Sequence, residues 1–228
     1  EEKKRKREDE EENDKTGPPT KKTATEEKKI PHGDTALIVV DMQNRFLECT
    51  RDGVVTNNCI NLINWFHSAS LPVFFTQHHD PNPDAVLYKW WNSPIPHGSF
   101  DWSLMPNIQA VVDEQRDVLV QEKATYDSFI NTPLEKDLRA AGVENVVICG
   151  CMTNLCCETT ARAAFCRNFN VWFPEDANGT KTNEMHQRSI ENLKFGFATI
   201  CTTKPLIGKL TEHQKKKKKN EKKNNQSI

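Results

Sequence analysis

The chain has 228 residues, of which 36% are hydrophobic and 28% are charged, and its formal net charge is −1 at neutral pH. It contains no apolar run near the roughly 18 residues of a membrane span, and its first residues lack the apolar core of a secretory signal. These features argue against a membrane-embedded protein, and we expect a cytoplasmic one with reduced thiols. The first residue is Glu rather than Met, so an upstream targeting segment stays an open alternative.

The charges are distributed unevenly along the chain. Residues 1–29 contain no Val, Ile, Leu, Phe, Trp or Tyr and carry ten acidic against ten basic residues. Such a segment buries too little apolar surface to offset its ordering entropy, which predicts a disordered tail. Residues 209–228 carry eight basic and two acidic residues and are predicted to form a second disordered, Lys-rich tail. Residues 30–208 then form one acidic domain, with a net charge of −7.

Short apolar segments alternate with segments of helical spacing in this domain. Residues Thr35 to Asp41 read TALIVVD, a near-continuous apolar run that is typical of a strand buried on both faces. A helix is predicted over Asn57 to Ala69 and a strand over Pro72 to Gln77. The stretch from His78 to Pro106 is rich in proline and holds three tryptophans, which predicts an irregular segment too long for a plain connector.

The alternation continues along the chain. Further strands are predicted at Asp117–Glu122, Asn145–Gly150, Asn170–Pro174 and Ala198–Thr202, and helices at Pro133–Ala141, Thr153–Arg167 and Glu184–Lys194. This order predicts a mainly parallel sheet covered by helices on both faces, a three-layer α/β/α sandwich. In open sheets of this type, ligands bind beyond the carboxyl ends of the strands.

Three reactive side-chain types stand at those strand ends. Asp41 closes the first strand, Lys123 follows the third, and the segment GCMTNLCC, Gly150 to Cys157, follows the fourth. Each alone has a commoner explanation, as a capping residue or a solvated charge. Their joint placement predicts that a carboxylate, an amine and a thiol meet at one edge of the sheet.

The neighbouring residues in the sequence distinguish Cys156 from the other cysteines. A zinc site within the cluster at 149–157 would match the two-pair spacing of structural zinc poorly. Thr153 is a good N-cap, which places Cys156 in the first turn of a helix, where the helix dipole favours an anion. We therefore expect the pKa of the Cys156 thiol to be lowered, and a nearby Lys123 ammonium would lower it further. Six others are expected to be small buried side chains: Cys59, Cys149, Cys151, Cys157, Cys166 and Cys201.

Several ordered motifs resemble the isochorismatase-like, or cysteine hydrolase, superfamily. The resemblance covers Thr35 to Thr203 and implies the fold above and a hydrolytic activity. In that family an Asp after the first strand, a Lys after the third and a Cys in a G-x-x-T-x-x-C turn form the catalytic triad, which implies Asp41, Lys123 and Cys156 here. The motifs are LIVVDMQNRF at 37–46, EKATYDSFINTPLEKDLRAAGVENVVICG at 122–150, GCMTNLCCETTARAAF at 150–165 and VWFPEDANG at 171–179.

The resemblance also implies a non-proline cis peptide between Cys151 and Met152, which would turn the backbone N–H groups of Met152 and Cys156 toward a substrate carbonyl. The hypothesis is that Asp41 takes the thiol proton, Lys123 stabilises the charged pair, and the thiolate cleaves the C–N bond of a small amide through a thioester. This chemistry needs no cofactor and no metal.

The sequence differs from two kinds of family member, the nicotinamidases and the isochorismatases proper, and these differences narrow the expected activity. Nicotinamidases of the family hold a metal through Asp-x-His after the second strand, but this segment reads TQHHDPNPD at 76–84, so a nicotinamidase is disfavoured. His78, His79 and His97 are expected to be solvated loop residues, with a shared metal site as the alternative. Isochorismatases proper cleave a vinyl ether without a thiol nucleophile; that activity is the alternative, while Cys156 favours an amidase.

Aromatic residues of the irregular segment are candidates for the substrate pocket. Trp90 and Trp91, together with Phe46, are expected to line it or to form a contact in the homo-oligomer that the resemblance implies. Gln43 and Tyr126 stand close to the triad residues in sequence, where they would orient the substrate or only pack.

The charged tails suggest a second kind of function. The run KKRKR at 3–7 resembles a nuclear localisation signal, so the nucleus is an alternative to the cytoplasm. The lysines at 215–219 would make salt-dependent contacts with RNA or an anionic membrane surface. Because the acidic domain offers no matching basic groove, binding to nucleic acid is the non-enzyme alternative rather than the expected function.

Overall fold

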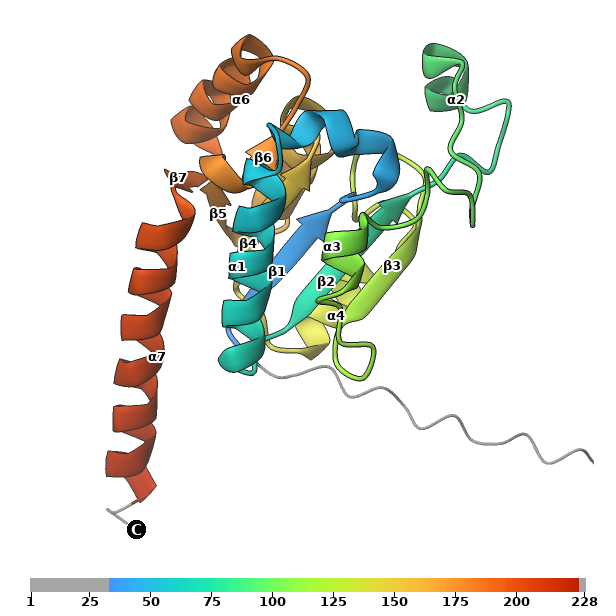
Figure 1. Ribbon diagram of the computed structural model, residues 1–228. Helices are drawn as coiled ribbons and strands as arrows, with labels where there is room; N and C mark the ends of the chain where they lie inside the picture. Colours follow the sequence, from blue (N-terminus) through green and yellow to red (C-terminus); the bar gives the residue numbers. More distant parts are fainter. Residues whose placement is uncertain (1–32, 226–228) are drawn as a thin grey trace, which may run out of the picture.

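The computed structural model describes residues 33–225 and contains one parallel sheet between two layers of helices (Figure 1). The sheet has the order β3-β2-β1-β4-β5-β7, and the short β6 pairs with β4. All of these pairings are parallel. The strands are β1 (Thr35–Val40), β2 (Val73–His78), β3 (Val118–Lys123), β4 (Asn145–Cys151), β5 (Asn170–Pro174), β6 (Asn178–Gly179) and β7 (Thr199–Cys201).

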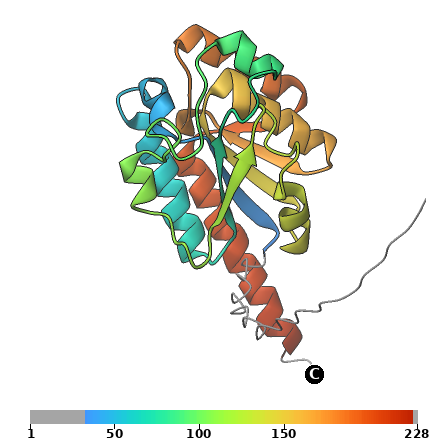
Figure 2. The ribbon, with the colours of Figure 1, turned by 90° about the vertical axis from the view of Figure 1, so that its right-hand side faces the viewer.

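The alternation of side chains along β1 explains the layers. Ala36, Ile38 and Val40 belong to one buried cluster, which includes residues of α4 (Leu134–Ala140), α5 (Glu158–Cys166) and α6 (Asn183–Gly196). Leu37 and Val39 belong to the other, with residues of α1 (Val54–Ser68), α3 (Pro106–Gln109) and α7 (Thr203–Asn225). Figure 2 shows α1 and α7 on one side of the sheet and α4 and α5 on the other. The predicted three-layer sandwich is confirmed.

The irregular segment after β2 contains more helix than the sequence predicted. It includes α2 (Val86–Trp91), a six-residue helix with no buried residue, and it leads into α3. In Figure 1, α2 lies apart from the sheet at the upper right. Because no residue of α2 packs into the core, its sequence shows none of the apolar periodicity that identifies a helix.

The expectation of a disordered tail from Lys209 onward was wrong for the described part of that segment. Helix α7 continues to Asn225, and its first turns pack on α1 through Leu206, Ile207 and Leu210. Trp65 Nε1 donates to Thr211 Oγ1 at 2.9 Å. The apolar residues at helical spacing lie before the lysine run. The run itself has no apolar periodicity, so the sequence there gives no sign that the helix continues.

The other tail expectations lie outside the described residues. These are the disordered segment at 1–29 and the basic run at 3–7. Within residues 33–225, no helix combines the length and the apolar character that a bilayer span requires.

Candidate active site

Three strand ends deliver the predicted side chains to one place. Asp41 follows β1, Lys123 ends β3, and Cys156 lies in η2 (Thr153–Cys157), the turn after β4. Lys123 Nζ lies 2.5 Å from Asp41 Oδ2 and 3.3 Å from Cys156 Sγ. The exposed fractions are 0% for Asp41 and Lys123 and 6% for Cys156. The carboxylate, the amine and the thiol therefore meet, as the sequence predicted.

The two charged groups stabilise each other inside the protein. Burial alone would raise the pKa of Asp41, but the charges of Lys123 and His78 and hydrogen bonds from Lys123 and Thr76 lower it below its usual value. Burial alone would lower the pKa of Lys123, and the neighbouring Asp41 and Cys156 raise it instead. The resting site thus holds an ammonium and a carboxylate in direct contact.

The expected lowering of the Cys156 pKa was wrong. Burial raises the pKa of this thiol to about 12, and the hydrogen bond to Asp41 and the charge of Asp41 add to the rise. Lys123 opposes the shift, as expected, but it does not cancel it. The Lys123 ammonium also contacts the Asp41 carboxylate, whose negative charge offsets part of the stabilisation that the ammonium gives to a thiolate. Cys156 therefore rests as a neutral thiol that needs a base.

The turn that carries Cys156 differs from the predicted helix start. Its first segment, η2, has π-helical hydrogen bonding, and Met152 rather than Thr153 stands at the cap position. Thr153 Oγ1 shares a hydrogen bond of 2.9 Å with His186 Nδ1 of α6. Burial, followed by the charge of Arg51, lowers the pKa of His186 to about 4, so the ring stays neutral. The cis peptide between Cys151 and Met152 is present.

Gly150 allows this turn to begin close to β1. It has φ of 127°, and a Cβ atom built on it would lie 2.0 Å from the carbonyl oxygen of Val40. No side chain fits there without displacing β4 from β1. The glycine of the sequence motif therefore fixes the distance between the Asp41 and Cys156 backbones.

Two further residues of the site were missed by the sequence analysis. Thr76 Oγ1 donates to Asp41 Oδ1 at 2.6 Å, so Asp41 has a partner on each oxygen. His78 is the last residue of β2 and lies beside Lys123 in the register of the β2 and β3 strands. Its Nε2 contacts Asp80 Oδ1 at 3.1 Å. Both belong to β2, which lies between β1 and β3. The strand order alone brings them to the site, and no motif in the sequence encodes that order.

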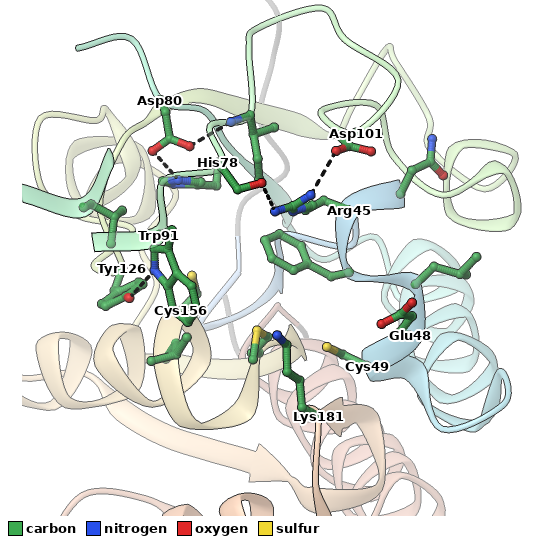
Figure 3. A pocket seen from close by; sticks show the side chains of 18 residues that line it. Arg45, Glu48, Cys49, His78, Asp80, Trp91, Asp101, Tyr126, Cys156 and Lys181 are labelled. Atoms are coloured by element: carbon green, nitrogen blue, oxygen red, sulfur yellow. Dashed lines mark hydrogen bonds and ion pairs between the residues drawn. The ribbon is translucent and has the colours of Figure 1, made fainter. Parts of the chain in front are cut away.

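A cavity of about 510 Å³ opens at Cys156 (Figure 3). Its wall includes the expected Phe46, Trp91 and Tyr126, and Met152 and Cys156 reach its floor. Trp91 Nε1 donates to Tyr126 Oη at 2.8 Å. The remaining lining residues are Asn44, Arg45, Leu47, Glu48, Cys49, His78, Asp80, Leu87, Ser93, Ile95, Asp101, Leu155 and Lys181.

Two predicted pocket residues do not line this cavity. The Gln43 side chain is fully buried, donates to the carbonyls of His78 and Trp102, and accepts from the His78 N–H at 2.8 Å. It therefore holds the loop that bears Trp102 against the end of β2. The Trp90 side chain is 76% exposed and lies outside the cavity. Assembly into a homo-oligomer through such residues stays a prediction.

The three histidines of this region agree only partly with the expectation of solvated loop residues, since His97 is exposed and His79 is half-buried. His78 is buried and held by Asp80, while the rings of His79 and His97 contact edge to face with centroids 5.7 Å apart. Within residues 33–225, no three His, Cys, Asp or Glu side chains are placed to hold a metal ion. The donor set therefore does not fit the metal of the family's nicotinamidases.

The cysteines outside the site agree only partly with the expected burial. Cys59, Cys149, Cys151 and Cys157 are fully buried, but Cys201 is only half-buried and Cys166, the last residue of α5, is exposed. Ala163 and Ala164 are buried, while Phe165 and Cys166 lie on the outward side of the helix, a difference of helical phase that a local count of apolar residues misses.

Comparison with known proteins identifies the family. A family model for the isochorismatase domain matches residues 35–205. The chain belongs to the isochorismatase family. It is 41% identical over 166 residues to nicotinamidase 3 of Arabidopsis thaliana, with 72% of this chain and 82% of the relative covered. A ureidoacrylate amidohydrolase of Acinetobacter baylyi is 25% identical over 226 residues, covering 85% and 91%.

Solved structures of the isochorismatase family agree with the fold. A cysteine hydrolase from Pseudomonas syringae pv. phaseolicola superimposes with a TM-score of 0.71 at 25% sequence identity, covering 78% of this chain and 93% of that one. Together with the sequence relatives, this places the chain among the hydrolases of the family.

Proposed function

We propose that this isochorismatase-family hydrolase cleaves the C–N bond of a small amide with Cys156 as nucleophile. The observation that carries the proposal is the position of Lys123 Nζ, which contacts Asp41 Oδ2 at 2.5 Å and Cys156 Sγ at 3.3 Å. The names of two relatives, a nicotinamidase and a ureidoacrylate amidohydrolase, support an amide as the substrate class.

The first step transfers the Cys156 proton to Asp41. A thiol whose pKa is about 12 is a poor nucleophile at neutral pH, so it needs this base. The transfer moves the negative charge from the carboxylate to the sulfur and leaves the net charge of the three groups unchanged. Because the Lys123 ammonium contacts both atoms, it pairs with the anion before and after the transfer. The buried site therefore creates no unpaired charge.

Acyl transfer follows from that state. The thiolate attacks the amide carbon, and the carbonyl oxygen becomes an oxyanion that the N–H groups of Met152 and Cys156 bind. Asp41 then protonates the leaving nitrogen, the C–N bond breaks, and a thioester remains on Cys156. Water attacks the thioester with Asp41 as base; the carboxylic acid leaves and the thiolate takes its proton back. No step requires a metal or a cofactor.

The substitution Cys156→Ala tests this mechanism. Ammonia release from a panel containing nicotinamide, small aliphatic amides and ureides should fall at least about 1000-fold, because the acyl intermediate cannot form. Cys166→Ala, at an exposed cysteine outside the site, is the matched control and should keep full activity. Turnover that survives in Cys156→Ala with an amide cleaved by the unaltered protein would disprove the thiol mechanism.

Hydrolysis of the vinyl ether of isochorismate is the second candidate. One relative of the chain, from Bacillus subtilis, is named an isochorismatase and is 26% identical over 190 residues. The thiol at the centre of the site favours the amide, since a vinyl ether needs a proton donor rather than a nucleophile. An isochorismate assay run beside the amide panel separates the two, because only the amidase reaction should depend on the Cys156 sulfur.

A further inference from the structure

The charged residues of the cavity wall differ in whether they have a partner. Arg45 pairs with Asp101 at 3.4 Å and donates to Ser93 Oγ at 2.5 Å. Asp80 accepts from His78 and from the Ile95 N–H. Lys181 forms no ion pair with any residue that the structure describes. Figure 3 shows its side chain rising into the cavity from the side opposite His78 and Asp80.

The backbone of Lys181 is fixed relative to the nucleophile. Strand β6 pairs with the end of β4, so the chain leaves the sheet beside Cys151. One residue before Lys181, Thr180 Oγ1 donates to Asn154 Oδ1 at 2.6 Å, within the same turn as Cys156. A group bound by the Lys181 ammonium is thereby held at a constrained distance from the sulfur.

The surroundings of Lys181 favour an anionic partner for it. Its Nζ lies 5.9 Å from the centroid of the Trp91 ring, and the apolar side chains of Phe46, Met152 and Leu155 line the same cavity. Lys181 is itself exposed at the edge of the cavity, so its ammonium is open to a ligand, and a bound carboxylate would accept a charge-assisted hydrogen bond from it. Glu48 also lines the cavity without an ion-pair partner in the described part of the chain, which opposes a second negative charge on the ligand.

We infer that Lys181 binds a carboxylate of the substrate, so that the substrate is an amide or ureide of a small carboxylic acid bearing one negative charge. The inference rests on the proposed amidase function and deepens it. The scissile carbonyl would lie over Cys156 while the carboxylate reaches Lys181 across the cavity. A neutral amide such as nicotinamide lacks the group that this ammonium would bind.

Paired substrates test the inference. Succinamate and N-carbamoylglycine carry a carboxylate, and their methyl esters have the same amide without the charge; ammonia release measures amide cleavage in all four. The unaltered protein should prefer the acids. In Lys181→Met, kcat/KM for the acids should fall about 10- to 100-fold, mainly through KM, while the esters should change less than about threefold.

Three more variants sharpen the result. Lys181→Arg should restore most of the acid preference, because it keeps the charge. Glu48→Gln should lower KM for the acids, because it removes the opposing carboxylate. Lys204→Met is the matched control, since Lys204 lies by α1 and α7 away from this cavity, and it should change neither substrate class.

The outcomes separate this inference from the amidase function itself. Calorimetric titration of the Cys156→Ala protein with each acid and ester measures binding without turnover. Equal binding of acids and esters, or equal losses for both in Lys181→Met, would overturn the role of Lys181. If nicotinamide and the esters are still cleaved with a dependence on Cys156, the amidase function survives. Amide cleavage that is independent of Cys156 would instead disprove the thiol mechanism.

Discussion

The floor and the wall of the candidate site are built on different principles. The triad floor, which is Asp41, Lys123 and Cys156, is almost completely buried, and only Cys156 reaches the cavity. The ends of β1 and β3 and the turn after β4 hold these residues. The aromatic wall is formed by Trp91 of α2 and by Tyr126, and Trp91 is 45% exposed. A buried ion pair between Lys123 and Asp41 stabilises the floor. In the wall, one hydrogen bond joins Trp91 to Tyr126.

This difference suggests how chemistry and substrate choice are separated in the molecule. Groups at the ends of parallel strands keep their spacing because the sheet fixes it. Helix α2, which supplies Trp91 to the wall, has no buried residue. Substitutions in α2 should therefore change the shape of the pocket and leave the packing of the core unchanged. Four substitutions test this contrast, and their expected effects decrease from the floor to the wall.

The largest effect is expected from Lys123→Met. It leaves the Asp41 carboxylate buried without its cation, which raises the Asp41 pKa and destabilises the fold by about 3 to 5 kcal/mol. Activity should fall below about one thousandth, because the thiolate loses its stabilising charge. Denaturant unfolding and ammonia release measure the two effects.

The double variant Lys123→Met/Asp41→Asn supplies the control for Lys123→Met. Because it also removes the unpaired carboxylate, it should be more stable than the single variant while staying inactive. A double variant as unstable as the sum of both single changes would show that the pair does not act as a unit.

Gly150→Ala should be the next most damaging substitution. The new methyl group would meet the Val40 carbonyl at 2.0 Å, and φ of 127° disfavours any side chain. We expect a loss of about 3 kcal/mol or more in the free energy of unfolding. Gly208→Ala, in α7 with no atom within 4 Å of the added carbon, is the control and should be neutral or stabilising by about 0.5 to 1 kcal/mol. Similar stability of both variants would contradict the close approach of β4 to β1.

Thr76→Val should change the pH dependence of the reaction. It removes the 2.6 Å hydrogen bond to Asp41, one of the interactions that lower the Asp41 pKa, so that pKa should rise. Activity requires ionised Asp41, and the acidic limb of the pH profile of kcat/KM should therefore move to higher pH. We expect a loss of about 10- to 100-fold at the acidic end of the profile. Thr56→Val, at a buried threonine of α1, should leave the profile unchanged.

The smallest effect is expected at the wall. Tyr126→Phe removes the bond from Trp91 Nε1, and KM should rise about two- to fivefold because the bond is partly exposed. Trp90→Phe, at a residue outside the cavity, is the control. Steady-state kinetics measure both. A large fall in kcat for Tyr126→Phe would mean that the wall takes part in the chemistry, and the contrast with the floor would then be lost.

The sequence by itself determined most of the strands and the helices between them, though not α2 or the length of α7, and it determined the three residues of the floor. Apolar runs such as TALIVVD identify buried strands, and three of them lead into Asp41, Lys123 and the turn of Cys156. Since parallel strands point their carboxyl ends to one edge, the sequence alone predicts that Asp41, Lys123 and the turn of Cys156 lie together. The spacing of Leu206 and Leu210 also indicates the helical start of α7, although the lysine run that follows is typical of a disordered tail.

Only the tertiary structure decided what depends on neighbours across strands and loops. Strand order brings Thr76 and His78 of β2 between β1 and β3, and nothing local in the sequence specifies that order. The pKa of Cys156 follows from burial and from Asp41 rather than from its position in a helical turn, so a local argument gave the wrong sign. The partners of Gln43 and the open ammonium of Lys181 likewise exist only where distant segments meet, because hydrogen bonds and charge pairs depend on distances in space.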